Sequence, residues 1–213
     1  MKGDNMPKGS AELTEARRTE IMEACKKLYE NMTFKDVNLK EIGKVTTFSR
    51  TSIYNYFESK EEIFLGIFED EYIKWTMELQ KIIDAGQMSR EKLAKKLADS
   101  LGKRKLMLKL LSVNLYDMEE NSRMERLVSF KKAYGKSRDV LTELIKKNYP
   151  GIKKKETDEF IFSFLPFLHG IHPYAFATPK QIEAMKEAKV KYNETTINKL
   201  VYSGLMKMLP IKE

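Results

Sequence analysis

Residues 41–61 of the 213-residue chain read EIGKVTTFSRTSIYNYFESKE and decide the interpretation of its N-terminal part. Just before this stretch, Asn38 is followed three residues later by Glu41, a pair typical of the start of a helix. Residues 46–48 interrupt the helical pattern, and Ser49 is the next residue able to cap a helix. The stretch therefore predicts two short helices joined by a three-residue turn, which is a helix-turn-helix.

The second of these helices combines one apolar face with several polar positions. Ile53 and Phe57 lie four residues apart and are expected to hold it against a core. The other positions carry short hydrogen-bonding groups and one guanidinium, namely Ser49, Arg50, Thr51, Ser52, Asn55 and Tyr56. Such groups can reach base edges in the major groove, where arginine reads guanine and asparagine reads adenine. Asn38 and Thr47 lie near helix starts, where backbone N–H groups can also hold phosphate oxygens.

A third, longer helix is expected to begin at Ser59, because Ser59 and Glu62 form a capping box. Lys60 lies in its first turn, where the helix dipole favours anionic side chains. A phosphate opposite Lys60 would explain that placement. The alternative is that these helices form an ordinary helical hairpin with polar outer faces.

The same stretch closely resembles the DNA-binding signature of tetracycline-repressor-like (TetR) transcriptional regulators. The residues that match it are Ile42, Ser49, Ile53, Tyr54, Tyr56, Phe57, Ser59, Lys60 and Glu61. The sequence departs from it at Gly43, at Thr46 and Thr47, where the family has alanine and glycine, at Phe48, and at Thr51. The resemblance implies that Tyr54 and Lys60 clamp phosphates while Arg50, Thr51, Ser52 and Asn55 face the bases.

Helical periodicity recurs through the rest of the chain with almost no alternating strand pattern, which predicts an all-α fold. The predicted division is a flexible N-terminal arm at residues 1–9, a three-helix DNA-binding head at 10–58 and a helical body at 59–213. The long helix from Ser59 would join head and body. Further helices are expected near residues 89–101, 105–119, 124–149, 157–176, 179–188 and 195–209.

Composition limits the classes of function. The net charge is +8, but residues 1–60 hold 11 basic and 9 acidic side chains, so the basic excess is not concentrated in the head. Cys25 is the only cysteine, which excludes a disulfide framework or a cysteine-based metal site within one chain and favours a reducing cytoplasm. The first ten residues contain no apolar run of the kind found in secretory signals. Cys25 itself is expected to be a core thiol.

Residues 160–179 contain no Asp, Glu, Lys or Arg, which is the length of a membrane span. Prolines and histidines interrupt the run, so a buried helix or a subunit interface is favoured over a span. His169 and His172 could bind a metal together, but no third ligand is evident, and no metal is expected. In the resembled family the last two long helices form a four-helix dimer bundle, here near residues 157–176 and 195–209. Gly204 would allow close backbone approach there.

The resemblance also implies a homodimer that binds double-stranded DNA at a palindromic operator and a body that encloses a small-molecule effector. Four side chains with an apolar surface and a polar group are candidates for the effector pocket: Trp75, Tyr116, His169 and Tyr174. Ordinary core packing is the alternative for each. No catalytic or cofactor-binding motif is found, so no cofactor and no enzymatic activity are expected. The second hypothesis is a helical small-molecule-binding protein or enzyme whose N-terminal hairpin is only structural.

Overall fold

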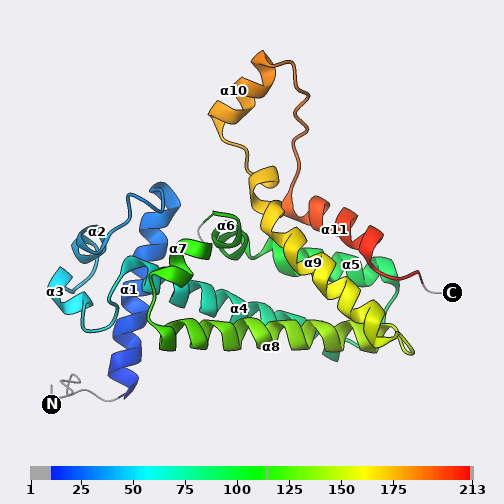
Figure 1. The fold of residues 1–213 in the computed structure, drawn as a ribbon, viewed down its shortest axis with the longest axis horizontal. Helices are drawn as coiled ribbons and strands as arrows, with labels where there is room; N and C mark the ends of the chain where they lie inside the picture. Colours follow the sequence, from blue (N-terminus) through cyan, green and yellow to red (C-terminus); the bar gives the residue numbers. More distant parts are fainter. Residues whose placement is uncertain (1–10, 114, 212–213) are drawn as a thin grey trace. The chain divides into compact units, whose positions relative to one another are not determined.

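The computed structural model describes residues 11–113 and 115–211, and all regular structure in that part of the chain is helical (Figure 1). The all-α prediction is therefore confirmed. The predicted flexible arm at residues 1–9 lies outside the described residues. The described chain divides into two compact units: one holds the residues up to Glu69 together with Tyr116–Lys131, and the other holds Asp70–Leu115 and the residues from Lys132 onward.

The first unit begins with α1 (Ala11–Asn31), α2 (Leu39–Lys44) and α3 (Arg50–Ile53). It also contains the start of α4 (Lys60–Asp84), most of α7 (Leu115–Glu120) and the start of α8 (Met124–Asn148). All three predicted caps are present. The Asn38 side chain accepts hydrogen bonds from the backbone N–H groups of Lys40 and Glu41, Ser49 caps α3, and Ser59 Oγ accepts from Glu62 N.

The core of the first unit is built from apolar side chains of α1, α2, α3 and α4. Fully buried members include Ile21, Ile42, Ile53 and Phe64. Cys25 is also fully buried, as expected of a core thiol, and burial raises the pKa of its thiol. Tight packing around α3 fixes which of its faces is left for solvent.

The second unit contains the remainder of α4 and α8 with α5 (Arg90–Gly102), α6 (Lys105–Val113), α9 (Lys154–Ala175), α10 (Pro179–Glu187) and α11 (Ile197–Met208). α11 packs against both α5 and α9, and α6 packs against α9. The helix expected over residues 105–119 is described as α6 and α7. α9 begins at Lys154, before the expected start at residue 157, because the Glu156 carboxylate accepts the backbone N–H of Lys153 and caps the first turn.

α9 continues through two prolines, Pro166 and Pro173, as far as Ala175. Its contact with α11 is close at Gly204, where a Cβ atom would lie 2.6 Å from Phe167 Cζ. The room left by Gly204 is thus taken by the Phe167 ring of the same chain, and the backbone approach expected between two subunits stays a prediction. No single helix of the described residues is long and apolar enough to cross a membrane, and the pair α9 and α10 passes such a test together only across an 81° bend.

Candidate nucleic-acid interface

The polar side of α3 is exposed. Arg50, Thr51 and Asn55 are exposed, and Tyr54 keeps 45% of its surface accessible. Arg50 Nη2 donates to the Tyr54 hydroxyl at 3.2 Å, and the guanidinium lies 5.8 Å from the centre of the Tyr54 ring. Arg50 therefore lies along its own helix over Tyr54, where it can extend toward a partner without disturbing the core.

A surface hollow of about 390 Å³ lies beside α3. It brings together predicted residues from the ends of three elements: Asn38 before α2, Arg50 at the start of α3 with Tyr54 at its C-cap, and Lys60 at the start of α4. It also contains Lys40, an exposed cation that the sequence analysis missed. The only sequence signal for Lys40 was its place in the first turn of α2, two residues after the cap.

Lys60 has protein partners in this structure. Its ammonium donates to the backbone oxygens of Phe34 at 2.6 Å and Lys35 at 3.4 Å, and it lies 4.7 Å from the centre of the Phe34 ring. The helix dipole disfavours a positive charge in the first turn of a helix, and these carbonyl oxygens stabilise the Lys60 ammonium there. A phosphate contact by Lys60 would have to replace or share these bonds.

The prediction that Tyr56 faces the bases is wrong. Tyr56 is 5% exposed, and its hydroxyl accepts a hydrogen bond from Arg17 Nη1 at 2.9 Å. α3 ends at Ile53, and the turn that follows, in which the Tyr56 N–H donates to the Ile53 backbone oxygen at 2.9 Å, leaves Tyr56 buried with Ile53 and Phe57. Its role here is to hold α1 beside the segment that follows α3.

Thr47 is also engaged within the protein. Its backbone N–H and its hydroxyl both donate to Glu20 Oε1, at 3.0 and 2.8 Å, and the backbone bond is the main cause that lowers the pKa of Glu20. The N–H of Thr47 is thus not available to a phosphate in this structure, contrary to the prediction. Lys189 is the one described non-glycine residue with positive φ, so Thr47 fills the turn without the left-handed backbone that glycine favours.

A buried carboxylate fixes the start of α4. Glu62 is 1% exposed and accepts from Arg123 Nε at 2.7 Å, Arg123 Nη2 at 2.9 Å, the Arg123 backbone N–H at 3.0 Å and the Glu58 backbone N–H at 2.9 Å. Burial alone would raise the pKa of Glu62, but these bonds outweigh it and the pKa is lowered. Ser59 Oγ also donates to the backbone oxygen of Asn121 at 2.9 Å. The segment that ends the helix-turn-helix is therefore tied to the turn between α7 and α8.

The four predicted effector residues do not meet at one site. Trp75 is fully buried and donates its indole N–H to Ser100 Oγ at 3.2 Å, so it is a core residue with no surface left for a ligand. Tyr116 belongs to the first unit and is 84% exposed. The prediction is wrong for these two, because periodicity alone does not separate core from surface aromatics. His169 and Tyr174 line two different cavities.

The cavity beside His169 has a volume of about 140 Å³, is partly open to solvent and is lined by residues of α4, α6, α8 and α9. Its apolar wall includes Leu111, Ile161, Leu165 and Leu168, and its polar groups come from Tyr72, Tyr134, Arg138 and His169. Burial lowers the pKa of His169, which favours the neutral imidazole. An apolar wall with a few polar groups is typical of a small-molecule site.

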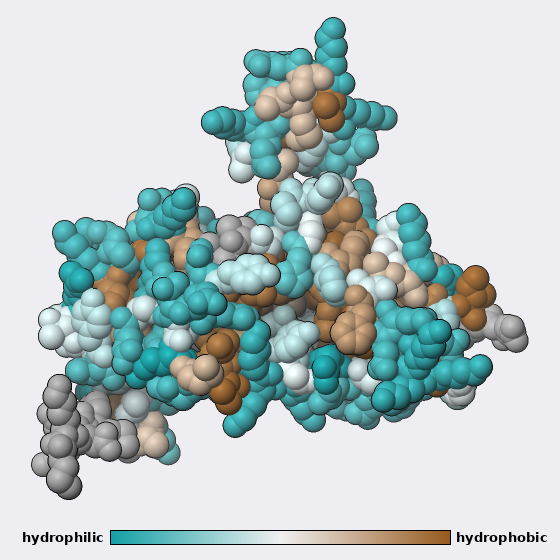
Figure 2. Space-filling view, in the orientation of Figure 1, coloured by the Kyte–Doolittle hydropathy of each residue, from teal (hydrophilic) through white to brown (hydrophobic). Residues whose placement is uncertain are grey.

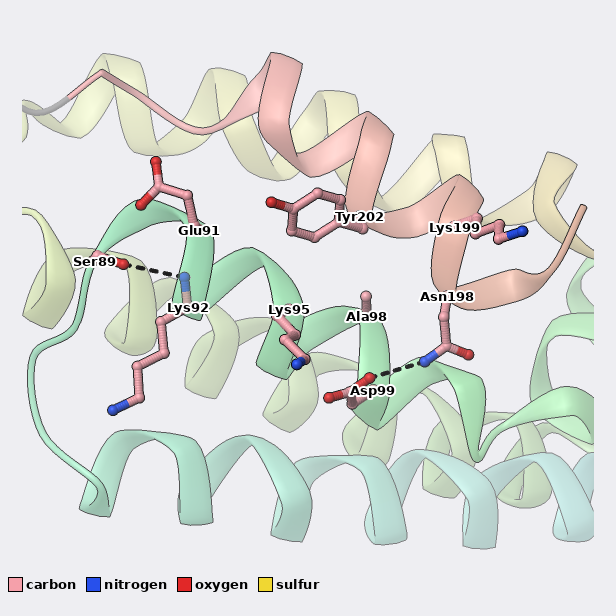
Figure 3. Close-up of a pocket in the computed structure, with 9 residues that line it drawn as sticks. All are labelled: Ser89, Glu91, Lys92, Lys95, Ala98, Asp99, Asn198, Lys199 and Tyr202. Atoms are coloured by element: carbon pink, nitrogen blue, oxygen red, sulfur yellow. Dashed lines mark hydrogen bonds between the residues drawn. The ribbon is translucent and has the colours of Figure 1, made fainter.

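Two further hollows lie on the second unit. One is an open groove of about 570 Å³ between α5 and α11, shown in Figure 3, where Tyr202 lies over α5 and Asn198 Nδ2 donates to Asp99 Oδ1 at 3.0 Å. Its lining holds three lysines and two carboxylates, so it contains charges of both signs. The other, of about 620 Å³, lies beside α10.

The two histidines of α9 differ in their surroundings. Burial, with the nearby Lys109 and Lys105, lowers the pKa of His172 to about 4. Among the described residues, no three His, Cys, Asp or Glu side chains lie close enough to hold a metal ion together.

Comparison with known proteins relates this chain to transcriptional regulators. Residues 69–209 match the family described as "Tetracyclin repressor-like, C-terminal domain". A stretch of 63 residues is 36% identical to an uncharacterized HTH-type transcriptional regulator, YfiR, of Bacillus subtilis (strain 168), and covers 30% of this chain and 31% of that protein. The match therefore spans about a third of the length of this curated relative.

Solved structures share the fold. A regulator of the TetR/AcrR family from Thermobifida fusca superposes with a TM-score of 0.60 at 17% identity and covers 91% of this chain and 97% of that one. The fatty acid degradation regulator FadR from Bacillus halodurans gives 0.59 at 13% identity, covering 91% and 94%. Thermus thermophilus FadR, solved in complex with lauroyl-CoA, gives 0.53 at 17% identity, covering 92% and 97%. With the family match over residues 69–209 and the helix-turn-helix before it, the chain belongs to the tetracycline-repressor-like family of DNA-binding transcriptional regulators.

Proposed function

We propose that this regulator represses transcription as a homodimer that binds a palindromic operator and is released by a small-molecule effector. The observation that carries the proposal is the exposed polar side of α3, where Arg50, Thr51 and Asn55 are accessible beside the hollow that holds Lys40 and Lys60. Arginine and asparagine side chains on a recognition helix read bases, and lysines at its edge contact phosphates. No catalytic step is part of the proposal.

The dimer is expected to form through α9 and α11. The outward side of α9 carries no charge over residues 160–175, yet it is open to solvent in one chain: Phe162 is 76% and Tyr174 is 73% exposed. On α11, Tyr202 is 37% exposed. An uncharged, aromatic surface of this kind is typical of subunit interfaces. A symmetric dimer would present two α3 helices to successive major grooves, about 34 Å apart.

The effector is proposed to occupy the cavity beside His169. A cavity of about 150 Å³ can hold a ligand the size of benzene, so the present 140 Å³ suits a compact apolar body with one polar group. Arg138 and Tyr134 would meet that polar group. A longer ligand, such as the acyl chain in the Thermus thermophilus structure, would have to widen the cavity. α4 and α8 line the cavity, and the first part of each helix belongs to the first unit. A shift of either helix on effector binding would therefore be transmitted to the first unit.

The first test is selection of bound duplexes from a random pool, followed by anisotropy titration of the best sequence and a scrambled one at several salt concentrations. Arg50→Ala should weaken binding to the selected palindrome by about 10- to 100-fold and leave the scrambled duplex almost unchanged, the effect of losing a base contact worth about 1–3 kcal/mol.

Lys40→Ala and Lys60→Ala should weaken both duplexes alike and reduce the salt slope by about one. Lys81→Ala is the matched control: it removes the same charge from an exposed side chain of the second unit. Weak binding that is indifferent to sequence, or an Arg50→Ala variant that behaves like Lys81→Ala, contradicts the proposal.

A further inference from the structure

The segment from Ala177 to Thr196, here called the α10 arm, stands apart from the rest of the second unit (Figure 1). It leaves the end of α9, forms α10 and returns to the start of α11. None of the residues of α10 is buried. Figure 2 shows the arm as a separate projection with apolar side chains on its visible side.

Both ends of α10 are specified by local sequence. At the start, Thr178 and Gln181 form a complete capping box, with Pro179 in the first helical turn. At the end, the N–H of Val190 donates to the backbone oxygen of Met185 at 2.8 Å, and Lys189 takes φ of 56°. This is a Schellman motif, a specific helix end that costs energy when the left-handed residue is not glycine. The local sequence of the arm therefore specifies a helix with defined ends.

Among the residues that the structure describes, nothing covers α10 closely enough to bury any of its side chains. A helix of nine residues is too short to be stable in water by itself, and most helical stability comes from packing of an apolar face. Ile182 is 38% exposed and Val190 is 55% exposed. A hollow of about 620 Å³ lies between the arm and the body, and its lining includes Pro173, Tyr174, Met185, Val190 and Leu200.

We propose that the α10 arm crosses to a second copy of this chain and packs against it, so that each subunit of the dimer clasps the other. The hollow beneath the arm brings its Met185 and Val190 beside Tyr174, which lies on the uncharged outward side of α9. α10 begins four residues after α9 ends, so the arm starts at the edge of the surface proposed for the dimer.

The chemistry of the arm favours a protein surface as the occupant. Charged side chains of both signs, Lys180, Glu183, Lys186 and Glu187, surround the apolar positions of α10. Such mixed charges suit the polar rim of a subunit contact. In this proposal, side chains of the second copy fill the hollow beneath the arm. That hollow is separate from the proposed effector cavity beside His169.

This inference rests on the homodimer of the proposed function, and the experiment separates the two. The oligomeric state of the full chain is first measured by sedimentation velocity at micromolar concentration. A photo-crosslinking amino acid is then placed at Ile182 and, as a matched control, at Glu183, which is the next residue and carries a charged, 61% exposed side chain. Equal amounts of isotopically heavy and light chain are mixed, so that mass spectrometry distinguishes links between chains from links within one chain.

The expected result is a covalent dimer from Ile182, with links between chains that map to α9, α10 or α11 of the second copy, and at least fivefold less from Glu183. Ile182→Asp with Val190→Asp should also raise the dimer dissociation constant more than tenfold, while Glu183→Gln changes it less than twofold. A dimer whose Ile182 probe gives only links within one chain, or none, overturns the arm inference alone. A chain that stays monomeric overturns both proposals.

Discussion

Replacing Glu62 by glutamine removes the charge from the carboxylate that holds the start of α4. The glutamine keeps one oxygen, which can still accept from Arg123 Nε and from the Arg123 backbone N–H. Its amide nitrogen then faces two donors, Arg123 Nη2 and the Glu58 backbone N–H, which the carboxylate accepts at 2.9 Å each. Two charge-assisted hydrogen bonds are lost, and donors are left opposed in a buried site.

The expected loss follows from these contacts. A hydrogen bond to a charged group contributes about 1.5–3 kcal/mol, and removing one partner of a buried ion pair costs about 3–5 kcal/mol. The Arg123 side chain is 33% exposed and keeps Glu58 at 3.4 Å and Glu125 at 3.6 Å, which reduces the cost. We therefore expect Glu62→Gln to lower the free energy of unfolding by about 2–3 kcal/mol, or the melting temperature by about 4–12 °C for a chain of this size.

The pH dependence gives a second readout. Because the pKa of Glu62 is lowered in the folded protein, its stabilisation is present above the unfolded pKa, about 4.3, and is lost as the pH falls through the folded pKa. The difference between wild type and Glu62→Gln should be constant from about pH 6 to 8 and should shrink below about pH 4. Urea unfolding followed by circular dichroism at several pH values measures it.

Glu61→Gln is the matched control, because it makes the same change one residue earlier, on a side chain that is not buried. It should cost about 0.5 kcal/mol through the helix dipole. If Glu62→Gln at pH 7 falls within 0.5 kcal/mol of this control, the buried carboxylate does not hold α4 as the geometry indicates.

Two further predictions concern packing. Tyr56→Phe loses the hydrogen bond from Arg17 and should lower the free energy of unfolding, measured in urea, by about 1 kcal/mol. The affinity for the operator should stay unchanged. A loss of affinity for the operator alone would show that Tyr56 contacts DNA. Gly204→Ala places a Cβ atom 2.6 Å from Phe167 Cζ, whereas the Cβ atom of Gly135→Ala meets nothing within 4 Å. The free energy of unfolding of Gly204→Ala should therefore be about 1–3 kcal/mol lower than that of Gly135→Ala. Equal melting temperatures for the two variants would show that the Phe167 ring moves aside without cost.

The local part of this fold could be predicted because it depends on neighbours in sequence. The caps at Asn38, Ser49 and Ser59 could be predicted, because each side chain accepts from a backbone N–H two or three residues later. The start of α4 at Lys60 followed from the cap at Ser59.

What could not be predicted depends on residues far apart. The bonds from Arg123 to Glu62 join positions 61 residues apart, and no local pattern marks either residue as a partner. The hydrogen bond from Arg17 to Tyr56 spans 39 residues, so the burial of Tyr56 was hidden by the polar residues around it. Sequence likewise showed the helical character of α10 without showing that none of its side chains is buried by the described part of the chain.

The composition of the first unit has a consequence for protein engineering. Because Tyr116–Lys131 folds with the residues up to Glu69, this unit is discontinuous in sequence. Glu62 and Arg123 lie on its two separate pieces. A chimeric regulator that joins only the first 69 residues to the body of another regulator would leave the Glu62 carboxylate without Arg123. Transplanting the DNA-reading specificity to another sensor would therefore require moving both segments together, or supplying an arginine at the corresponding place in the recipient.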